Sequence, residues 1–109
     1  MAYDEQLAER IRVALSGREG VRERKMFGGI AFMVGGNMAA GVIRDDLMVR
    51  VGPDSHDDAL AQPHVREMDF AGRPMKGMIY VSADGVASDS ELDRWVTAGA
   101  EFAASLPPK

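Results

Sequence analysis

Two consecutive glycines preceded by basic side chains form the feature of this sequence best suited to binding an anion. Arg24 and Lys25 stand shortly before Gly28 and Gly29. Successive glycine amides can turn together toward a phosphate or carboxylate, and the two cations would add charge. The residues after Gly29 favour a strand, whereas phosphate-binding loops and dinucleotide fingerprints require a helix there. A bulge or tight bend that lets a sheet twist is therefore the favoured interpretation, and an anion site is the alternative.

A small-ligand or anion-binding site would need further basic residues to join this segment. Arg50, Arg73 and Lys76 are the candidates, and they belong to predicted strands later in the chain. The hypothesis requires the predicted hairpins to bring all of these cations close to the two glycines.

The two histidines, His56 and His64, are the imidazoles available for binding a metal. Five carboxylates lie near them in the sequence: Asp54, Asp57, Asp58, Glu67 and Asp69. The separation of the histidines spans a predicted helix and a proline and matches no regular ligand spacing. Helix capping and the helix dipole account for the acidic run, so we predict a solvated surface rather than a metal site.

The residue types do not supply a complete catalytic set. The chain has no cysteine, which excludes disulfides, thiolate catalysis and cysteine-ligated metals. The serines lie near predicted element ends, where capping accounts for them, and none stands in a Gly-x-Ser-x-Gly elbow. The acidic pairs Asp45-Asp46 and Asp57-Asp58 lie in a predicted turn and a predicted helix start. We therefore expect no enzymatic activity, no cofactor and no metal.

The composition is that of an ordinary globular protein. The chain has 109 residues, of which 46% are hydrophobic and 28% charged, which fits one domain over residues 1–109. Its net charge is −4, whereas nucleic-acid-binding domains usually carry a basic surplus. Residues 18–25 alone are locally basic, so weak nucleic-acid binding is a third hypothesis and a direct nucleic-acid ligand is not expected. The absence of a long apolar stretch and of a secretory signal predicts a cytoplasmic protein without membrane contact.

Amphipathic helices are predicted near both ends of the chain. Residues 4–16 carry apolar side chains at helical spacing, with Asp4 as the N-cap and Gly17 at the C-terminal end. Ser88-Asp89-Ser90-Glu91 fits a capping box, and a long apolar stripe follows it as far as Pro107.

Between these helices the apolar pattern alternates with period two, which predicts β-strands. Three or four strands are expected between Val21 and Val51, with a hairpin turn at Gly35-Gly36-Asn37. A short acidic helix from Pro53 to Pro63 follows, and then a second hairpin with strands at 65–70 and 75–81 and a turn at 71–74. Short turns indicate antiparallel pairing, because parallel neighbours need a long crossover.

These elements predict an α+β fold of two layers, in the order helix, three or four strands, short helix, two strands, helix. The terminal helices would cover one face of an antiparallel sheet of five or six strands. Several strands carry apolar residues on both faces, among them Met33, Met48, Met78 and Tyr80. Either a second subunit buries the second face, or the sheet curls around its own side chains. We favour a homodimer.

Three segments resemble a known family. The TfoX/Sxy N-terminal domain family opens with an Arg/Lys-Met-Phe-Gly-Gly motif, which resembles Lys25-Met26-Phe27-Gly28-Gly29-Ile30-Ala31-Phe32. Its second hairpin looks like residues 72–81, and its terminal helix is similar to Asp93-Arg94-Trp95-Val96 and Ala104-Ser105-Leu106-Pro107. The resemblance covers nearly the whole chain.

The resemblance implies a two-layer fold like that of the type III secretion chaperones, often paired as dimers. It also implies kinship with bacterial regulators of competence genes, which act with other transcription factors. Those regulators carry a further, C-terminal helical domain, whereas this chain is expected to be a stand-alone N-terminal domain. We know of no catalytic residue in the family to carry over. The leading hypothesis is therefore a non-enzymatic regulatory or adaptor module that contacts a protein partner.

Overall fold

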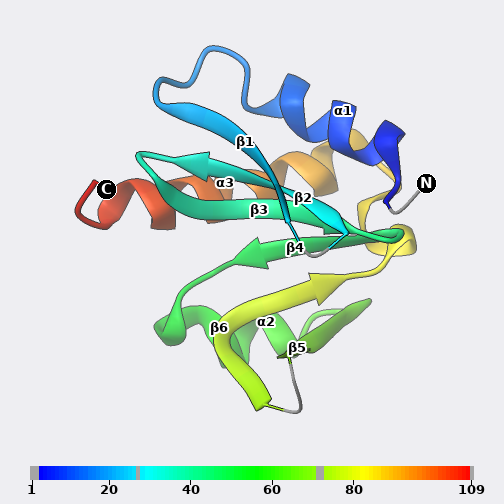
Figure 1. Cartoon of the computed structure of the whole chain (residues 1–109). Helices are drawn as coiled ribbons and strands as arrows, with labels where there is room; N and C mark the ends of the chain where they lie inside the picture. Colours follow the sequence, from blue (N-terminus) through cyan, green and yellow to red (C-terminus); the bar gives the residue numbers. More distant parts are fainter. Residues whose placement is uncertain (1–2, 27, 71–72, 109) are drawn as a thin grey trace.

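The computed structural model describes residues 3–26, 28–70 and 73–108, which form three α-helices and one six-stranded sheet (Figure 1). The helices are α1 (Glu5–Ala14), α2 (His56–Leu60) and α3 (Asp89–Ser105). The strands are β1 (Val21–Met26), β2 (Gly29–Val34), β3 (Asn37–Ile43), β4 (Asp46–Arg50), β5 (Val65–Phe70) and β6 (Arg73–Val81). Short 3-10 helices, η1 (Pro53–Ser55) and η2 (Ala83–Val86), precede α2 and α3. The predicted α+β fold and its element order are confirmed.

Parts of two predicted features lie outside the described residues. These are Phe27 of the glycine motif, and Ala71 and Gly72 of the second predicted turn. Among the helices that the structure describes, none has both the length and the apolar character needed to cross a membrane.

The sheet is antiparallel throughout and has the strand order β1-β2-β3-β4-β6-β5. Strands β1 to β4 form a meander, because each is joined to the next by a short turn. Gly35 and Gly36 both adopt positive φ, 61° and 83°, at the turn between β2 and β3. The β5–β6 hairpin joins the meander through β6, which pairs with β4, so β1 and β5 are the two edges.

Both long helices begin at the predicted caps. The Asp4 side chain accepts hydrogen bonds from the backbone N–H groups of Gln6 and Leu7 at 3.0 and 3.1 Å. Ser88 accepts one from the N–H of Glu91 at 3.3 Å. The second hydrogen bond predicted for the capping box, from the Ser88 N–H to the Glu91 carboxylate, is wrong. The Glu91 carboxylate instead accepts a hydrogen bond from Arg94, one turn later, at 2.7 Å.

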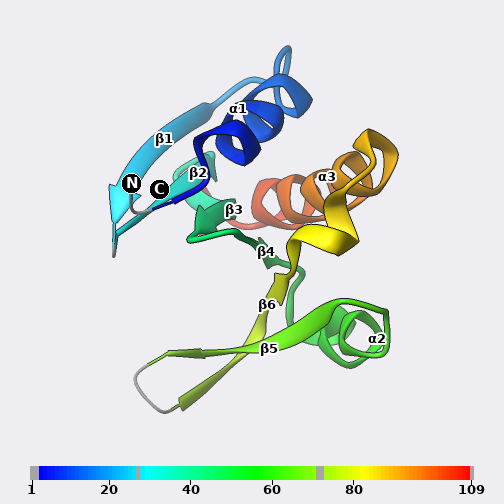
Figure 2. The same cartoon turned by 90° about the vertical axis from the view of Figure 1, so that its right-hand side faces the viewer.

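Figure 2 shows α1 and α3 on one side of strands β1 to β4, with no helix of the described residues on the other side. We call the side with α1 and α3 the helix face and the opposite side the outer face. The main core lies under the helices, where Phe32, Leu47 and Ile79 of the sheet are fully buried. Trp95 of α3 is buried there too, as predicted. Burying each such side chain contributes about 1.5–3 kcal/mol, so this core accounts for the attachment of both helices.

A second, smaller apolar cluster lies on the outer face. Met48, Met68 and Met78 are 6%, 8% and 7% exposed, and Met38, Ile43 and Tyr80 pack against them. Of the two explanations offered for the apolar second face, the structure shows that the sheet covers much of it with its own side chains. The three buried methionines therefore do not themselves require a second subunit.

Candidate functional site

The two glycines of the signature motif have separate backbone roles. Gly28 adopts φ 76°, in the left-handed region that side chains rarely enter, and so forms the bend between β1 and β2. Gly29 begins β2, where a Cβ atom would collide with the carbonyl oxygen of Val42 on β3. The bend interpretation therefore has a direct structural cause at Gly28, whereas Gly29 allows the close approach of β2 and β3.

The strand order separates the cations of the anion-binding hypothesis. Arg24 and Lys25 are exposed on β1, and β2 and β3 lie between that strand and Arg50 at the end of β4. Arg50 stacks on the ring of Phe102 in α3, with its guanidinium 5.5 Å from the ring centroid. Arg73 and Lys76 are on β6, beyond β4. The structure thus does not gather these residues around the glycines, and anion binding stays a prediction.

His56 is buried, and the predicted solvated surface is wrong for this residue. It is 4% exposed at the start of α2. Its Nδ1 accepts a hydrogen bond from the backbone N–H of Gly77 at 2.9 Å, and its Nε2 lies 3.3 Å from a carboxylate oxygen of Glu67. With Nδ1 acting as the acceptor, Nε2 carries the proton and donates to Glu67. The ring therefore joins α2 to β5 and β6, while His64 is exposed as expected.

Replacing His56 by phenylalanine is expected to lower the free energy of unfolding by about 1–3 kcal/mol, because the buried Gly77 N–H loses its acceptor. Chemical denaturation of the purified variant measures the change. The matched control is His64→Asn at the exposed histidine, because asparagine tolerates the φ of 67° there, and it should change stability by less than about 0.5 kcal/mol. Equal losses in the two variants would show that the hydrogen bond to Gly77 does not matter.

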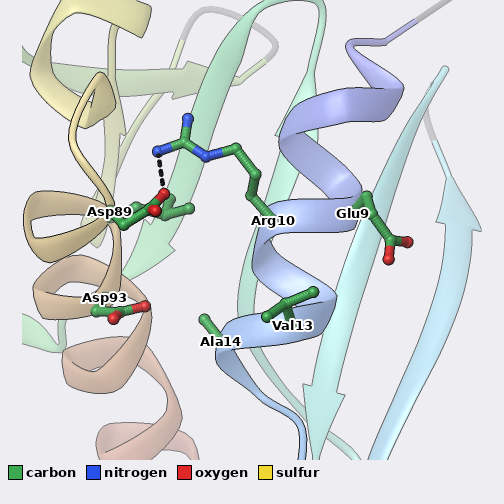
Figure 3. Close-up of a pocket in the computed structure, with 7 residues that line it drawn as sticks. Glu9, Arg10, Val13, Ala14, Asp89 and Asp93 are labelled. Atoms are coloured by element: carbon green, nitrogen blue, oxygen red, sulfur yellow. Dashed lines mark hydrogen bonds and ion pairs between the residues drawn. The ribbon is translucent and has the colours of Figure 1, made fainter.

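A pocket of about 270 Å³ lies between α1 and α3, and Figure 3 shows the residues that line it. Its apolar lining comes from Val13, Ala14 and Leu92. Arg10 crosses it, donating to Asp89 at 3.2 Å and to the carbonyl oxygen of Val86 at 2.8 Å. The guanidinium is thus occupied in tying α1 to the start of α3. Its carboxylates, Glu9, Asp89 and Asp93, are exposed, and no histidine, serine or threonine is found among the described residues of the lining.

An ion pair between α1 and β1 shows which side of the edge strand meets the helices. Arg12 binds the Glu23 carboxylate through two N–H groups, at 2.5 and 2.7 Å, and lies 5.9 Å from the Phe32 ring centroid. Hydrogen bonding to Arg12 holds the pKa of Glu23 below its usual value. Glu23 therefore belongs to the helix face, and its neighbours Arg22 and Arg24 belong to the outer face.

The outer face is the candidate interaction site. Half-buried apolar side chains from three strands surround the buried methionine cluster there: Met33, Met38, Ile43 and Tyr80. The register confirms the shared face, because Met33 pairs with Met38 and Met48 pairs with Tyr80, and directly opposed residues of antiparallel strands point the same way. Chemically, this surface offers apolar, polarizable contacts rather than acid–base groups.

We compared the chain with known proteins. The model of the TfoX N-terminal domain family matches residues 13–103, which is most of the chain. Neither curated proteins nor solved structures gave a match. The matched region includes the glycine motif, all six strands and most of α3.

Proposed function

Because this chain belongs to the TfoX N-terminal domain family, we propose that it is a non-enzymatic regulatory or adaptor module acting through protein–protein contacts. The observation that carries the proposal is the partly exposed apolar belt on the outer face, formed by Met33, Met38, Ile43 and Tyr80. Methionine-rich surfaces adapt to the shape of protein partners, because the side chain is flexible and polarizable. Kinship with competence regulators supports a role in transcriptional control through a partner.

The histidines and the pockets support the non-enzymatic part of the proposal. His56 engages both ring nitrogens in holding α2 against the sheet, and the acids that line the pocket between α1 and α3, Glu9, Asp89 and Asp93, are exposed carboxylates rather than a buried acid–base pair. A second pocket of about 480 Å³ is lined by residues of α2 and α3, among them Ala59, Trp95 and Phe102, and by neighbouring residues such as Val51, which follows β4. Its polar groups include Asp58, Arg94 and Glu101, which form no paired acid and base in a buried setting.

Self-association is the second part of the proposal. Val13 on α1 is a large apolar side chain that remains 63% exposed, beside the pocket between α1 and α3. A second copy docking on this side would cover it and would leave the outer face free for another protein.

Light scattering after size exclusion tests self-association, and capture of proteins from native lysate by the tagged chain tests the adaptor role. We expect a mass near twice that of the 11.8 kDa chain at high micromolar concentration, and retained proteins absent from a tag-only control. A strict monomer that retains nothing above the control would contradict the proposed function.

A further inference from the structure

We propose that the outer face binds an acidic amphipathic segment of a partner protein, with Arg24 and Arg66 contacting its carboxylates at the two ends of a methionine-rich floor. This inference rests on the proposed function and adds the chemistry of the partner. The distribution of charge on this face favours an acidic partner.

One row of directly paired residues crosses the whole sheet on the outer face. Five successive register pairs connect it, in the order Arg24, Ala31, Gly41, Met48, Tyr80 and Arg66. The row begins on the edge strand β1 and ends on the edge strand β5, so an arginine stands at each end and apolar or small residues lie between them. Six strands about 4.8 Å apart give the row a contour of about 24 Å.

The charges on this face are mostly positive, although the chain as a whole carries −4. The register assigns Arg22, Arg24 and Arg66 to it, with Asp46 as the carboxylate among the described side chains. Asp46 is already bound to Arg66 at 2.8 Å. Arg50 has an outer-face register position at the end of β4, but its guanidinium stacks on Phe102 of α3 and so does not add to the charge of this face. Arg22 and Arg24 are exposed, and no salt bridge to either is found among the described residues.

The carboxylates of the helices lie away from the outer face. Exposed acids of α2 and α3 are Asp57, Asp58, Asp89, Glu91, Asp93 and Glu101. If two copies met through their outer faces, a two-fold contact would place one arginine-rich patch against the same patch of the partner. Like charges facing one another across an interface cost several kcal/mol. Charge complementarity therefore favours an acidic partner segment over a second copy on this face.

The floor of the row can adapt to an apolar partner. Ala31 is fully buried, and the methyl carbon of Met48 lies only 2.8 Å from where a Cβ on Gly41 would be. The Met48 side chain thus lies over Gly41 and fills the space that the glycine leaves. Its rotatable bonds allow it to move and make room for a partner's apolar side chain, as methionines do on adaptable binding surfaces.

Arg66 is already oriented for this contact. It stacks on Tyr80, with the guanidinium 5.1 Å from the ring centroid, and half of its side chain remains exposed. A planar guanidinium fixed in this way can bind a second carboxylate on its free edge. A helix of about 16 residues has the length of the row, and apolar residues three and four apart would place its apolar stripe on the methionines.

A synthetic helical peptide tests the proposal. The probe has about 16 residues, leucines at helical spacing and glutamates on the flanks, and the comparison probe has lysine in place of every glutamate. We expect the acidic peptide to bind at least about tenfold more tightly than the lysine peptide in fluorescence anisotropy, and to weaken as salt is added. Equal binding of both peptides would overturn the charge requirement.

Arg24→Glu and Lys25→Glu form a matched pair of variants. They are neighbours on the same exposed strand and change the charge equally, but Arg24 is on the outer face and Lys25, paired with Ile30, is on the helix face. We expect Arg24→Glu to weaken binding of the acidic peptide by about tenfold or more and Lys25→Glu by less than about twofold. Equal effects in the two variants would show that the peptide responds only to the overall charge of the protein, and would overturn the assignment of the site.

Two further measurements separate this inference from the proposed function. If the wild-type chain and Arg24→Glu retain the same native proteins equally well, the outer-face site is wrong while the adaptor role stands. If neither retains any protein and the chain is a monomer, the proposed function fails. Duplex DNA that binds more tightly than the acidic peptide, and loses binding with Arg24→Glu, would assign these cations to nucleic acid and overturn the proposal.

Discussion

Replacing Gly29 by alanine is expected to lower the free energy of unfolding by about 3 kcal/mol, a large part of the stability of a domain this size. The added Cβ would collide with the carbonyl oxygen of Val42, and the Cα of Ile43 lies 3.4 Å from the same point. Both neighbours are backbone atoms of β3, so relief requires β2 and β3 to move apart. Urea denaturation followed by circular dichroism measures the loss.

Gly17→Ala is the matched control, because Gly17 adopts φ 86° and has open space around its missing Cβ. It should lose about 1–2 kcal/mol through backbone strain alone. Gly29 carries no such φ, so its larger loss would come from the collision. A Gly29→Ala variant as stable as the wild type would contradict the close approach of β2 and β3.

Gly99→Ala is expected to destabilise the protein by about 2–3 kcal/mol, although alanine is the better helix former. Gly99 lies within α3, and a Cβ there would collide with the carbonyl oxygen of Ala39 on β3. Helix propensity favours the alanine by about 1 kcal/mol, and the displaced helix costs more. The free energy of unfolding decides between the two effects.

Ala98→Gly, at the neighbouring exposed position of α3, isolates the propensity effect and should cost about 1 kcal/mol. If Gly99→Ala instead raised stability, α3 would not pack on β3 as closely as described. The two variants together measure how much of the helix attachment depends on this glycine.

Much of the fold could be predicted from the sequence, because its signals are local. Asp4 and Ser88 satisfy free N–H groups of the helix that follows each, and Gly35-Gly36 fit the hairpin turn. Alternating apolar residues indicate strands wherever a sheet is half buried. The place of the β5–β6 hairpin in the strand order could not be predicted in this way, because the pairing of β6 with β4 joins residues far apart in the chain.

His56 shows why the rest could not be predicted. Its neighbours Asp54, Asp57 and Asp58 give the sequence around it an exposed character, which led to the wrong prediction of a solvated surface. The burial depends on Gly77, more than twenty positions away, whose N–H needs an acceptor. A histidine beside a helix start gives no local sign of such a distant partner.

The candidate site was visible in part. The alternating methionines indicated an apolar second face, but the sequence did not show whether a subunit or the sheet itself covers it. The arginines at the two ends of the outer-face row come from β1 and β5, and only the register across all six strands places them in one line. The earlier set of cations around Gly28-Gly29 mixed residues of both faces, because adjacent positions in a strand point to opposite sides.

NMR of methionine methyl groups during titration with the acidic peptide tests most directly whether the outer face is the contact surface. The account predicts that the methyl signals of Met33, Met38 and Met48 shift with one common affinity, while the indole signal of Trp95 on the helix face stays unchanged. Shifts confined to Trp95 and Val13, with the three methionine signals unmoved, would contradict it.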